Sequence, residues 1–106
     1  LGRYSESRQG DPAELDAFID AARPLDFPWA VCCFGSAEAA AVSRAAKLGG
    51  HARIGFENNR VLPGGTVALN NAELVRATVA VCSEPDAPER PLATADWVRK
   101  HLSAID

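Results

Sequence analysis

The sequence lacks a long apolar run, a basic block and a disulfide-like set of cysteines, and each absence excludes a class of protein. No apolar stretch approaches the ~20 residues that span a bilayer. No basic start followed by an apolar segment marks a signal peptide, and the first residue is Leu1, so we interpret this terminus as a cut within a longer chain. We therefore expect no membrane partner.

Basic residues are also too few and too scattered for a nucleic-acid binder. The chain carries 11 lysines and arginines against 14 acidic residues, and its net charge is -3. The positive patch that attracts phosphate backbones is missing, so we expect no nucleic-acid partner.

The three cysteines, Cys32, Cys33 and Cys82, are an odd number without metal-like spacing. Cys32 and Cys33 lie inside an apolar run, where a thiol usually behaves as a small hydrophobic group. We predict that all three are reduced structural thiols in a cytoplasmic protein.

What is present is the balance of one globular domain: 106 residues, of which 47% are apolar and 24% charged. Helices are predicted over residues 11–22, 36–48, 70–82 and 94–105, because apolar residues recur there at helical spacing. Their predicted N-caps are Asp11, Ser36, Asn70 or Asn71, and Thr94. The predicted apolar face of the third helix is Leu74, Val75, Val79 and Cys82, and that of the fourth is Trp97, Val98, His101, Leu102 and Ile105.

Two short apolar runs, residues 29–34 and 52–56, are predicted as strands, and residues 1–4 are too few to decide on a third. Strands that alternate with helices indicate a parallel sheet covered by helices. Two or three such strands leave both sheet edges open. The chain is therefore predicted to be the last part of a larger α/β domain, and the competing interpretation is a small self-contained three-layer α/β protein.

The second strand carries the clearest candidate for chemistry. Because side chains alternate along a strand, one face is predicted to hold Ala52, Ile54 and Phe56, and the other Arg53, Gly55 and Glu57. Glu57 would end the strand, where barrel enzymes place catalytic groups. The absence of a side chain at Gly55 would let the Arg53 guanidinium extend toward Glu57. The alternative is an ion pair that only fills space.

The same stretch, residues 49–59 (GGHARIGFENN), resembles the signature near the end of the β-keto acid cleavage enzyme family, which includes 3-keto-5-aminohexanoate cleavage enzymes. The resemblance continues through residues 62–65 (LPGG), 71–75 (NAELV) and 92–95 (LATA). It also reaches back to 29–31 (WAV) and 34–35 (FG). It thus covers most of the chain from Trp29 onward.

The resemblance implies a (β/α)8 TIM barrel, with residues 1–106 as the C-terminal segment of that single domain, covering roughly strands six to eight. It implies that Glu57 is a metal ligand beside two histidines of a His-x-His motif, and that Arg53 is catalytic. Asn58 takes the place of an aspartate that some members pair with the arginine, so a catalytic Asn58 would act by hydrogen bonding, since an amide does not ionise.

The implied reaction is a retro-Claisen cleavage in which a β-keto acid and acetyl-CoA give acetoacetate and a new acyl-CoA. The implied cofactor is a divalent metal, zinc, and the complete protein is expected to be a homo-oligomer. This sequence contains only His51 and His101, neither in a His-x-His pair. We interpret both as structural, and we expect the segment alone to be inactive.

Two alternatives accompany this interpretation. The whole chain could be a small noncatalytic α/β binding module that lacks the metal histidines. Locally, Gly35-Ser36 joins a strand to a helix start that could hold an anion such as a coenzyme A phosphate. A plain helix cap is the favoured interpretation of that dipeptide.

Overall fold

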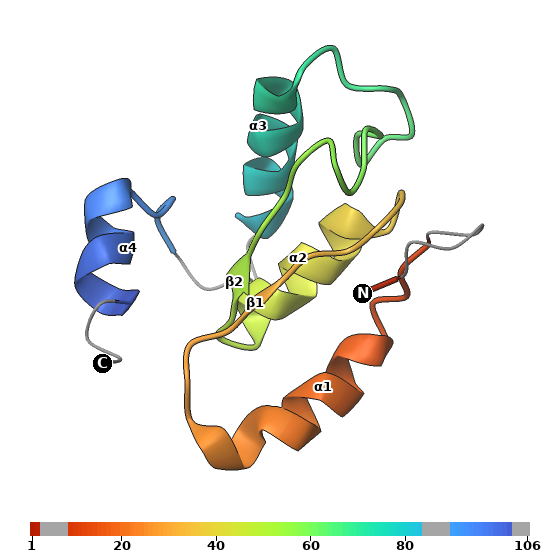
Figure 1. Cartoon of the computed structure of the whole chain (residues 1–106). Coiled ribbons are helices and arrows are strands. Elements are labelled where there is room, and N and C mark those ends of the chain that lie inside the picture. The colour runs from red at the N-terminus through yellow and green to blue at the C-terminus, as the bar shows by residue number, and fades with distance from the viewer. Residues whose placement is uncertain (3–8, 84–89, 103–106) are drawn as a thin grey trace.

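The computed structural model of the chain describes residues 1–2, 9–83 and 90–102 (Figure 1). Among these residues four α-helices, one turn of 3-10 helix and two short strands are found. In chain order they are α1 (Glu14–Ala22), η1 (Arg23–Leu25), β1 (Ala30–Val31), α2 (Glu38–Lys47), β2 (His51–Ala52), α3 (Asn71–Cys82) and α4 (Ala95–Leu102).

The two strands pair in parallel, with Ala30 opposite His51 and Val31 opposite Ala52. Backbone hydrogen bonds of 2.9 Å run from the His51 N–H to the Trp29 carbonyl and from the Arg53 N–H to the Val31 carbonyl. Helix α2 connects the strands, which makes a β-α-β unit. The predicted parallel arrangement is therefore confirmed for this pair.

Both strands are shorter than predicted, since residues 32–34 and 53–56 do not pair with each other. Instead, the Leu1 amino group donates to the Cys32 carbonyl at 2.6 Å, and the Phe34 N–H donates to the Leu1 carbonyl at 3.0 Å. Beyond β2 the chain turns, with the Asn58 N–H bonded to the Gly55 carbonyl at 3.0 Å. Each predicted strand thus loses its pairing because its later residues bond elsewhere.

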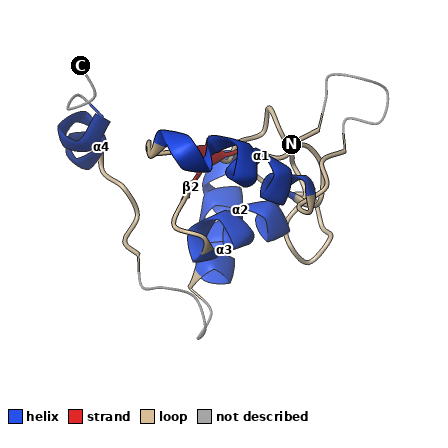
Figure 2. Cartoon of the chain, turned by 90° about the horizontal axis from the view of Figure 1, so that it is seen from below, coloured by secondary structure: helices blue, strands red, loops and turns tan. Residues whose placement is uncertain are grey.

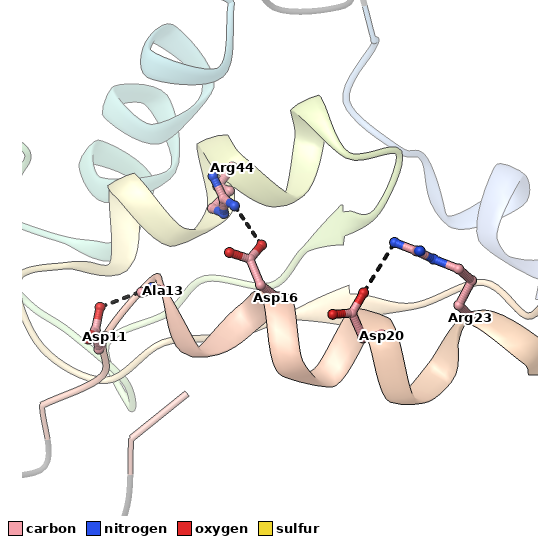
Figure 3. Close-up of polar contacts among 6 residues, drawn as sticks. All are labelled: Asp11, Ala13, Asp16, Asp20, Arg23 and Arg44. Carbon is pink, nitrogen blue, oxygen red and sulfur yellow. Dashed lines mark hydrogen bonds and ion pairs between the residues drawn. The ribbon is translucent and has the colours of Figure 1, made fainter.

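Helix α1 lies beside α2, and an ion pair joins them. Asp16 of α1 and Arg44 of α2 point toward each other, with 2.5 Å between Oδ1 and Nη2 (Figure 3). The predicted Asp11 cap is confirmed in part. Its side chain accepts a hydrogen bond from the Ala13 N–H at 2.9 Å, but the regular helix begins only at Glu14.

Helix α2 forms the centre of the core, and its small residues allow close packing. Ala41, Val42 and Ala45 are fully buried, and the core cluster combines Val42 and Ala45 with Leu15 and Val31. The helix ends at the predicted glycines. Gly49 has φ +87°, and the N–H groups of Gly49 and Gly50 bond to the Ala46 and Ala45 carbonyls, which is the Schellman arrangement.

Helix α3 packs against α2, and Asn70 is its cap. The Asn70 side chain accepts from the Glu73 N–H at 2.9 Å, while the Glu73 carboxylate accepts from the Leu69 N–H at 2.6 Å. The predicted apolar face is partly wrong. Thr78 is buried beside Leu74, and its hydroxyl donates to the Leu74 carbonyl, whereas Val79 is exposed.

Helix α4 lies apart from the other helices in both views (Figures 1 and 2). Thr94 is its cap, as predicted, because its hydroxyl accepts from the Trp97 N–H at 3.1 Å. The predicted apolar face is not buried here, since Trp97 and Val98 are 37% and 39% exposed. Ile105 and the Leu102 side chain fall outside the described residues.

The described residues therefore form part of an α/β domain. Two paired strands do not define a closed barrel, so the barrel stays a prediction. None of the described helices has the length and apolar character needed to cross a membrane.

Candidate functional site

The loop that follows β2 carries all three residues singled out from the sequence: Arg53, Glu57 and Asn58. Its path is fixed by backbone hydrogen bonds. The N–H groups of Asn58 and Asn59 both bond to the Gly55 carbonyl, at 3.0 and 3.1 Å. The Asn58 carbonyl accepts from the Gly35 N–H at 3.0 Å. The loops that follow β1 and β2 therefore meet at the carboxyl ends of neighbouring parallel strands, where α/β proteins place ligand sites.

Arg53 and Glu57 form an ion pair with 3.3 Å between Nη2 and Oε1. The predicted route to this contact is wrong, because an extended strand would have separated the two residues by about 13 Å. The turn at Gly55 brings Glu57 back beside Arg53 instead. The side chains are 69% and 51% exposed, so both groups remain accessible to a ligand.

The absence of a side chain at Gly55 leaves space for the Glu57 carboxylate. A Cβ added at this buried glycine would overlap the carboxylate, falling 2.8 Å from both its Cδ and Oε1 and closer still to Oε2. Any larger residue at position 55 would thus displace the Glu57 carboxylate and disrupt its contact with Arg53.

The residues predicted to form the apolar face of this strand are buried only in part. Ile54 packs against the core cluster, but Ala52 is exposed. Phe56 lies in the turn, and the Arg60 guanidinium sits 5.0 Å from its ring centroid in a cation–π contact. The alternation predicted for a strand ends because the chain turns between Gly55 and Asn58.

The Asn59 side chain holds the loop through hydrogen bonds. This residue was not singled out from the sequence. It is buried, and its side chain makes three hydrogen bonds. Its Oδ1 accepts from the Val61 N–H at 3.0 Å, and its Nδ2 donates to the Val61 carbonyl at 2.7 Å and to Glu38 Oε1 at 3.3 Å.

Glu38, in the first turn of α2, is likewise missed by the sequence analysis, and its side chain is fully buried. Burial raises the pKa of its carboxyl above the usual value, and the nearby Glu57 charge acts in the same direction. Hydrogen bonds from the Asn59 side chain and the Gly55 backbone oppose this rise in pKa. A signal existed, because position 38 shares a helix face with Val42 and Ala45, so a glutamate interrupts an apolar stripe.

Two buried side-chain atoms in the described part of the chain have no hydrogen-bond partner there, and both belong to this region. They are Oε2 of Glu38 and Nδ2 of Asn58. Unsatisfied buried polar atoms are rare in folded proteins, and a catalytic role or a bound water or ion is among their explanations.

The Ser36 cap predicted for α2 is wrong. The helix begins at Glu38 after Ala37, without a side-chain cap, and Ser36 is exposed. The Gly35 N–H already bonds to the Asn58 carbonyl, so it does not point to an external anion. Gly35 has φ +87°, a conformation that glycine adopts without strain.

The two histidines make aromatic and polar contacts away from the loop. Trp97 lies between them, 5.3 Å from the His51 ring and stacked 4.0 Å from the His101 ring. Arg90 Nη2 is 3.1 Å from His51 Nδ1. Burial, with smaller contributions from Arg90 and His101, lowers the pKa of His51. Across residues 1–2, 9–83 and 90–102, no three His, Cys, Asp or Glu residues lie close enough together to hold a metal.

The three cysteines are all free. Burial raises the pKa of the Cys33 and Cys82 thiols, which keeps them in the unreactive protonated form at neutral pH. An apolar cavity of about 480 Å³ borders Cys32 and is lined mainly by α1, η1 and β1, including Leu15, Phe18 and Trp29. It is a separate feature from the loop after β2.

Comparison with known proteins relates the chain to an enzyme family. The family model described as beta-keto acid cleavage enzyme matches residues 1–103. The chain is also similar to a 3-keto-5-aminohexanoate cleavage enzyme from Fusobacterium nucleatum subsp. nucleatum, at 34% identity over 86 residues. That alignment covers 81% of this chain and 30% of the relative. The aligned residues therefore span less than a third of the relative's length.

Proposed function

Because this chain belongs to the beta-keto acid cleavage enzyme family, we propose that the full-length gene product cleaves a β-keto acid by a retro-Claisen reaction. Acetyl-CoA is the co-substrate, and the products are acetoacetate and a new acyl-CoA. The observation that carries this proposal is the accessible Arg53–Glu57 pair at the carboxyl end of β2. These two residues stand where the sequence resembles the family signature.

Arg53 is proposed to hold the carboxylate of the β-keto acid. A guanidinium has five N–H donors and grips a carboxylate through two parallel hydrogen bonds. In the structure, Glu57 engages Arg53 through a single contact between Nη2 and Oε1. Ion pairs this exposed contribute at most about 1 kcal/mol, so Arg53 retains the capacity to bind a substrate carboxylate.

Glu57 is proposed as the carboxylate ligand of a divalent metal, with zinc expected. The fit is incomplete within this chain, since the described residues provide no three-residue cluster and the sequence has no His-x-His pair. Glu57 can supply one anionic oxygen, because its side chain is half exposed. When bound, such a metal polarises a keto oxygen and stabilises an enolate.

Asn58 is proposed to contribute by hydrogen bonding. Its Nδ2 is buried and has no hydrogen-bond partner among the described residues, so it can donate to a substrate oxygen that enters the loop. Its backbone is already fixed by hydrogen bonds to Gly55 and Gly35, which limits the positions that this amide can reach.

The test is an assay of the full-length gene product with a set of β-keto acids, in the presence and absence of acetyl-CoA. Acetoacetate and a new acyl-CoA should form together, and only when acetyl-CoA is present. Arg53→Ala should lower kcat/KM at least 100-fold. Arg23→Ala removes an equally exposed arginine that pairs with Asp20 and should change kcat/KM less than twofold.

Absence of both products with every β-keto acid would support the noncatalytic binding module instead. Formation of acetoacetate without acetyl-CoA would contradict the proposed co-substrate. Equal activities of the Arg53→Ala and Arg23→Ala variants would remove Arg53 from the site.

A further inference from the structure

We propose that Glu38 is a positioning residue for the reaction, because its buried carboxylate holds the Asn59 amide and thereby fixes the turn that brings Glu57 beside Arg53. This inference rests on the proposed function. Glu38 belongs to α2 rather than to the loop, so it would act through Asn59 and not by touching the substrate.

A path of contacts leads from α2 to the loop. Glu38 Oε1 accepts from Asn59 Nδ2 at 3.3 Å, and the Asn59 N–H bonds to the Gly55 carbonyl at 3.1 Å. Gly55 is the residue against which the Glu57 carboxylate rests. Two hydrogen bonds and one packing contact therefore connect the first turn of α2 with Glu57.

A second path starts from the same helix end and runs through the backbone. The Glu38 N–H donates to the Gly35 carbonyl at 3.1 Å, and the Gly35 N–H donates to the Asn58 carbonyl at 3.0 Å. The loop is thus held at two consecutive residues, Asn58 through its carbonyl and Asn59 through its side chain. Two attachment points fix the orientation of a turn, whereas one attachment would leave it free to rotate.

The type of residue at position 38 also indicates a positioning role. Burying a carboxylate costs free energy that an apolar residue of similar volume avoids, so core stability alone favours leucine. A buried polar group gives a defined geometry in return, because the bond from Asn59 Nδ2 to Glu38 Oε1 forms in only a narrow range of arrangements. Glu38 is fully buried on the same helix face as Val42 and Ala45, where a purely structural role would need no polar group.

The experiment compares three substitutions in α2 of the full-length gene product. Glu38→Ala removes the acceptor, and Glu38→Gln keeps both the acceptor oxygen and the volume. Val42→Ala, the matched control, truncates another fully buried side chain one turn along the same helix. All rates are measured per folded molecule.

Glu38→Ala should lower kcat at least tenfold, because a displacement of 1 Å at a reacting group can reduce the rate about 100-fold. Glu38→Gln should restore kcat to within threefold of the wild type. Val42→Ala should change it less than twofold. If Glu38→Ala does not fold, Asn59→Ala removes the same hydrogen bond from the loop side, together with the two bonds to Val61, and should lower kcat at least as much.

Amide hydrogen exchange provides a readout that does not depend on catalysis. In Glu38→Ala, exchange at the Asn58, Asn59 and Val61 amides should accelerate at least tenfold more than in Val42→Ala, and Glu38→Gln should match the wild type. If the wild-type protein cleaves no β-keto acid, the proposed function fails, and exchange still decides whether Glu38 fixes the loop. Equal kcat and equal exchange in Glu38→Ala and Val42→Ala would overturn the inference.

Discussion

The two ends of helix α2 hold two different segments, and they do so by different means. At its first turn the buried Glu38 and the Gly35 peptide hold the loop after β2. At its last turn Arg90, which is exposed, donates to the Gly50 and Ala46 carbonyls and so attaches the C-terminal segment that leads into α4. The first attachment centres on two buried side chains, Glu38 and Asn59. The second is made by an exposed arginine whose bond to the Gly50 carbonyl is half-buried.

The two attachments differ in how strictly they fix the position of the segment that they hold. A buried hydrogen bond has no competing water, so breaking it leaves an unsatisfied group and its geometry is strongly fixed. A cation at a helix C-terminus is favourable over a range of positions, because it interacts with the negative end of the helix dipole. We therefore expect the loop after β2 to set catalytic geometry, whereas the C-terminal segment can shift at little cost. Four predictions test this comparison.

The largest expected effect is on the loop itself. Glu57→Gln should lower the affinity of the full-length gene product for zinc at least tenfold, because a neutral amide replaces an anionic oxygen ligand and even outer-shell losses cost about 10–100-fold. Metal content after dialysis against a weak chelator, measured by mass spectrometry, gives the result. Asp20→Asn, on the exposed side of α1, is the control. Full zinc retention by Glu57→Gln would exclude Glu57 as a ligand.

A substitution at Arg53 should lower turnover without changing the metal content. Arg53→Lys is expected to keep the wild-type metal content and to reduce turnover about tenfold, because lysine cannot make the planar two-point contact with a carboxylate. Steady-state rates and metal content are measured on the same preparation. Loss of metal from this variant would mean that Arg53 supports the metal site rather than the substrate.

Gly55→Val should lower turnover at least tenfold, because the branched side chain takes the space of the Glu57 carboxylate. Ile54→Val, one position earlier, should leave turnover within twofold and cost about 0.5–1.5 kcal/mol of stability, since it removes one methylene from the edge of the core. The measurement is kcat at matched folded fraction, with thermal melts for stability. Similar kcat losses in both variants would refute the role assigned to Gly55.

The smallest effect concerns the C-terminal segment and depends on pH. The pKa of His51 is lowered by burial and by the charges of Arg90 and His101, so the unfolded or detached state binds more protons than the attached one. Attachment is therefore complete above the ordinary histidine pKa of ~6.5 and weakens as the pH falls through it. Hydrogen exchange in α4, corrected for intrinsic rates, should accelerate severalfold between pH 7.5 and 5.5. His51→Gln should abolish this pH dependence while leaving kcat unchanged.

Much of the fold follows from local sequence signals. The β-α-β order, the glycine ending of α2 and the caps at Asn70 and Thr94 depend on residues within a few positions of each other. Such signals fail where a distant segment competes for the backbone. The strand after Val31 is shortened because Phe34 bonds to Leu1, more than thirty residues away in the sequence.

The candidate site likewise combines residues that local sequence signals indicate with residues that depend on distant contacts. Arg53 and Glu57 lie within five residues and share a resemblance to a family signature, so the sequence alone singles out both as candidates. Glu38 was missed because its partner, Asn59, is 21 positions away. The local signal was its place on the helix face of Val42 and Ala45. The predicted Ser36 cap is wrong for a related reason, since the preceding peptide bonds to Asn58 instead.

Helix α2 also acts as a spacer whose length and phase are both fixed. Its 10 residues span about 15 Å, and each residue advances the helix by about 100°. Inserting one alanine after Ser43 would rotate one end against the other by that angle, so the Glu38–Asn59 contact and the Arg90–Gly50 contact could not both persist. The exposed turn at residues 63–65 has no such constraint, and the chain should accept an added residue there far more readily than within α2.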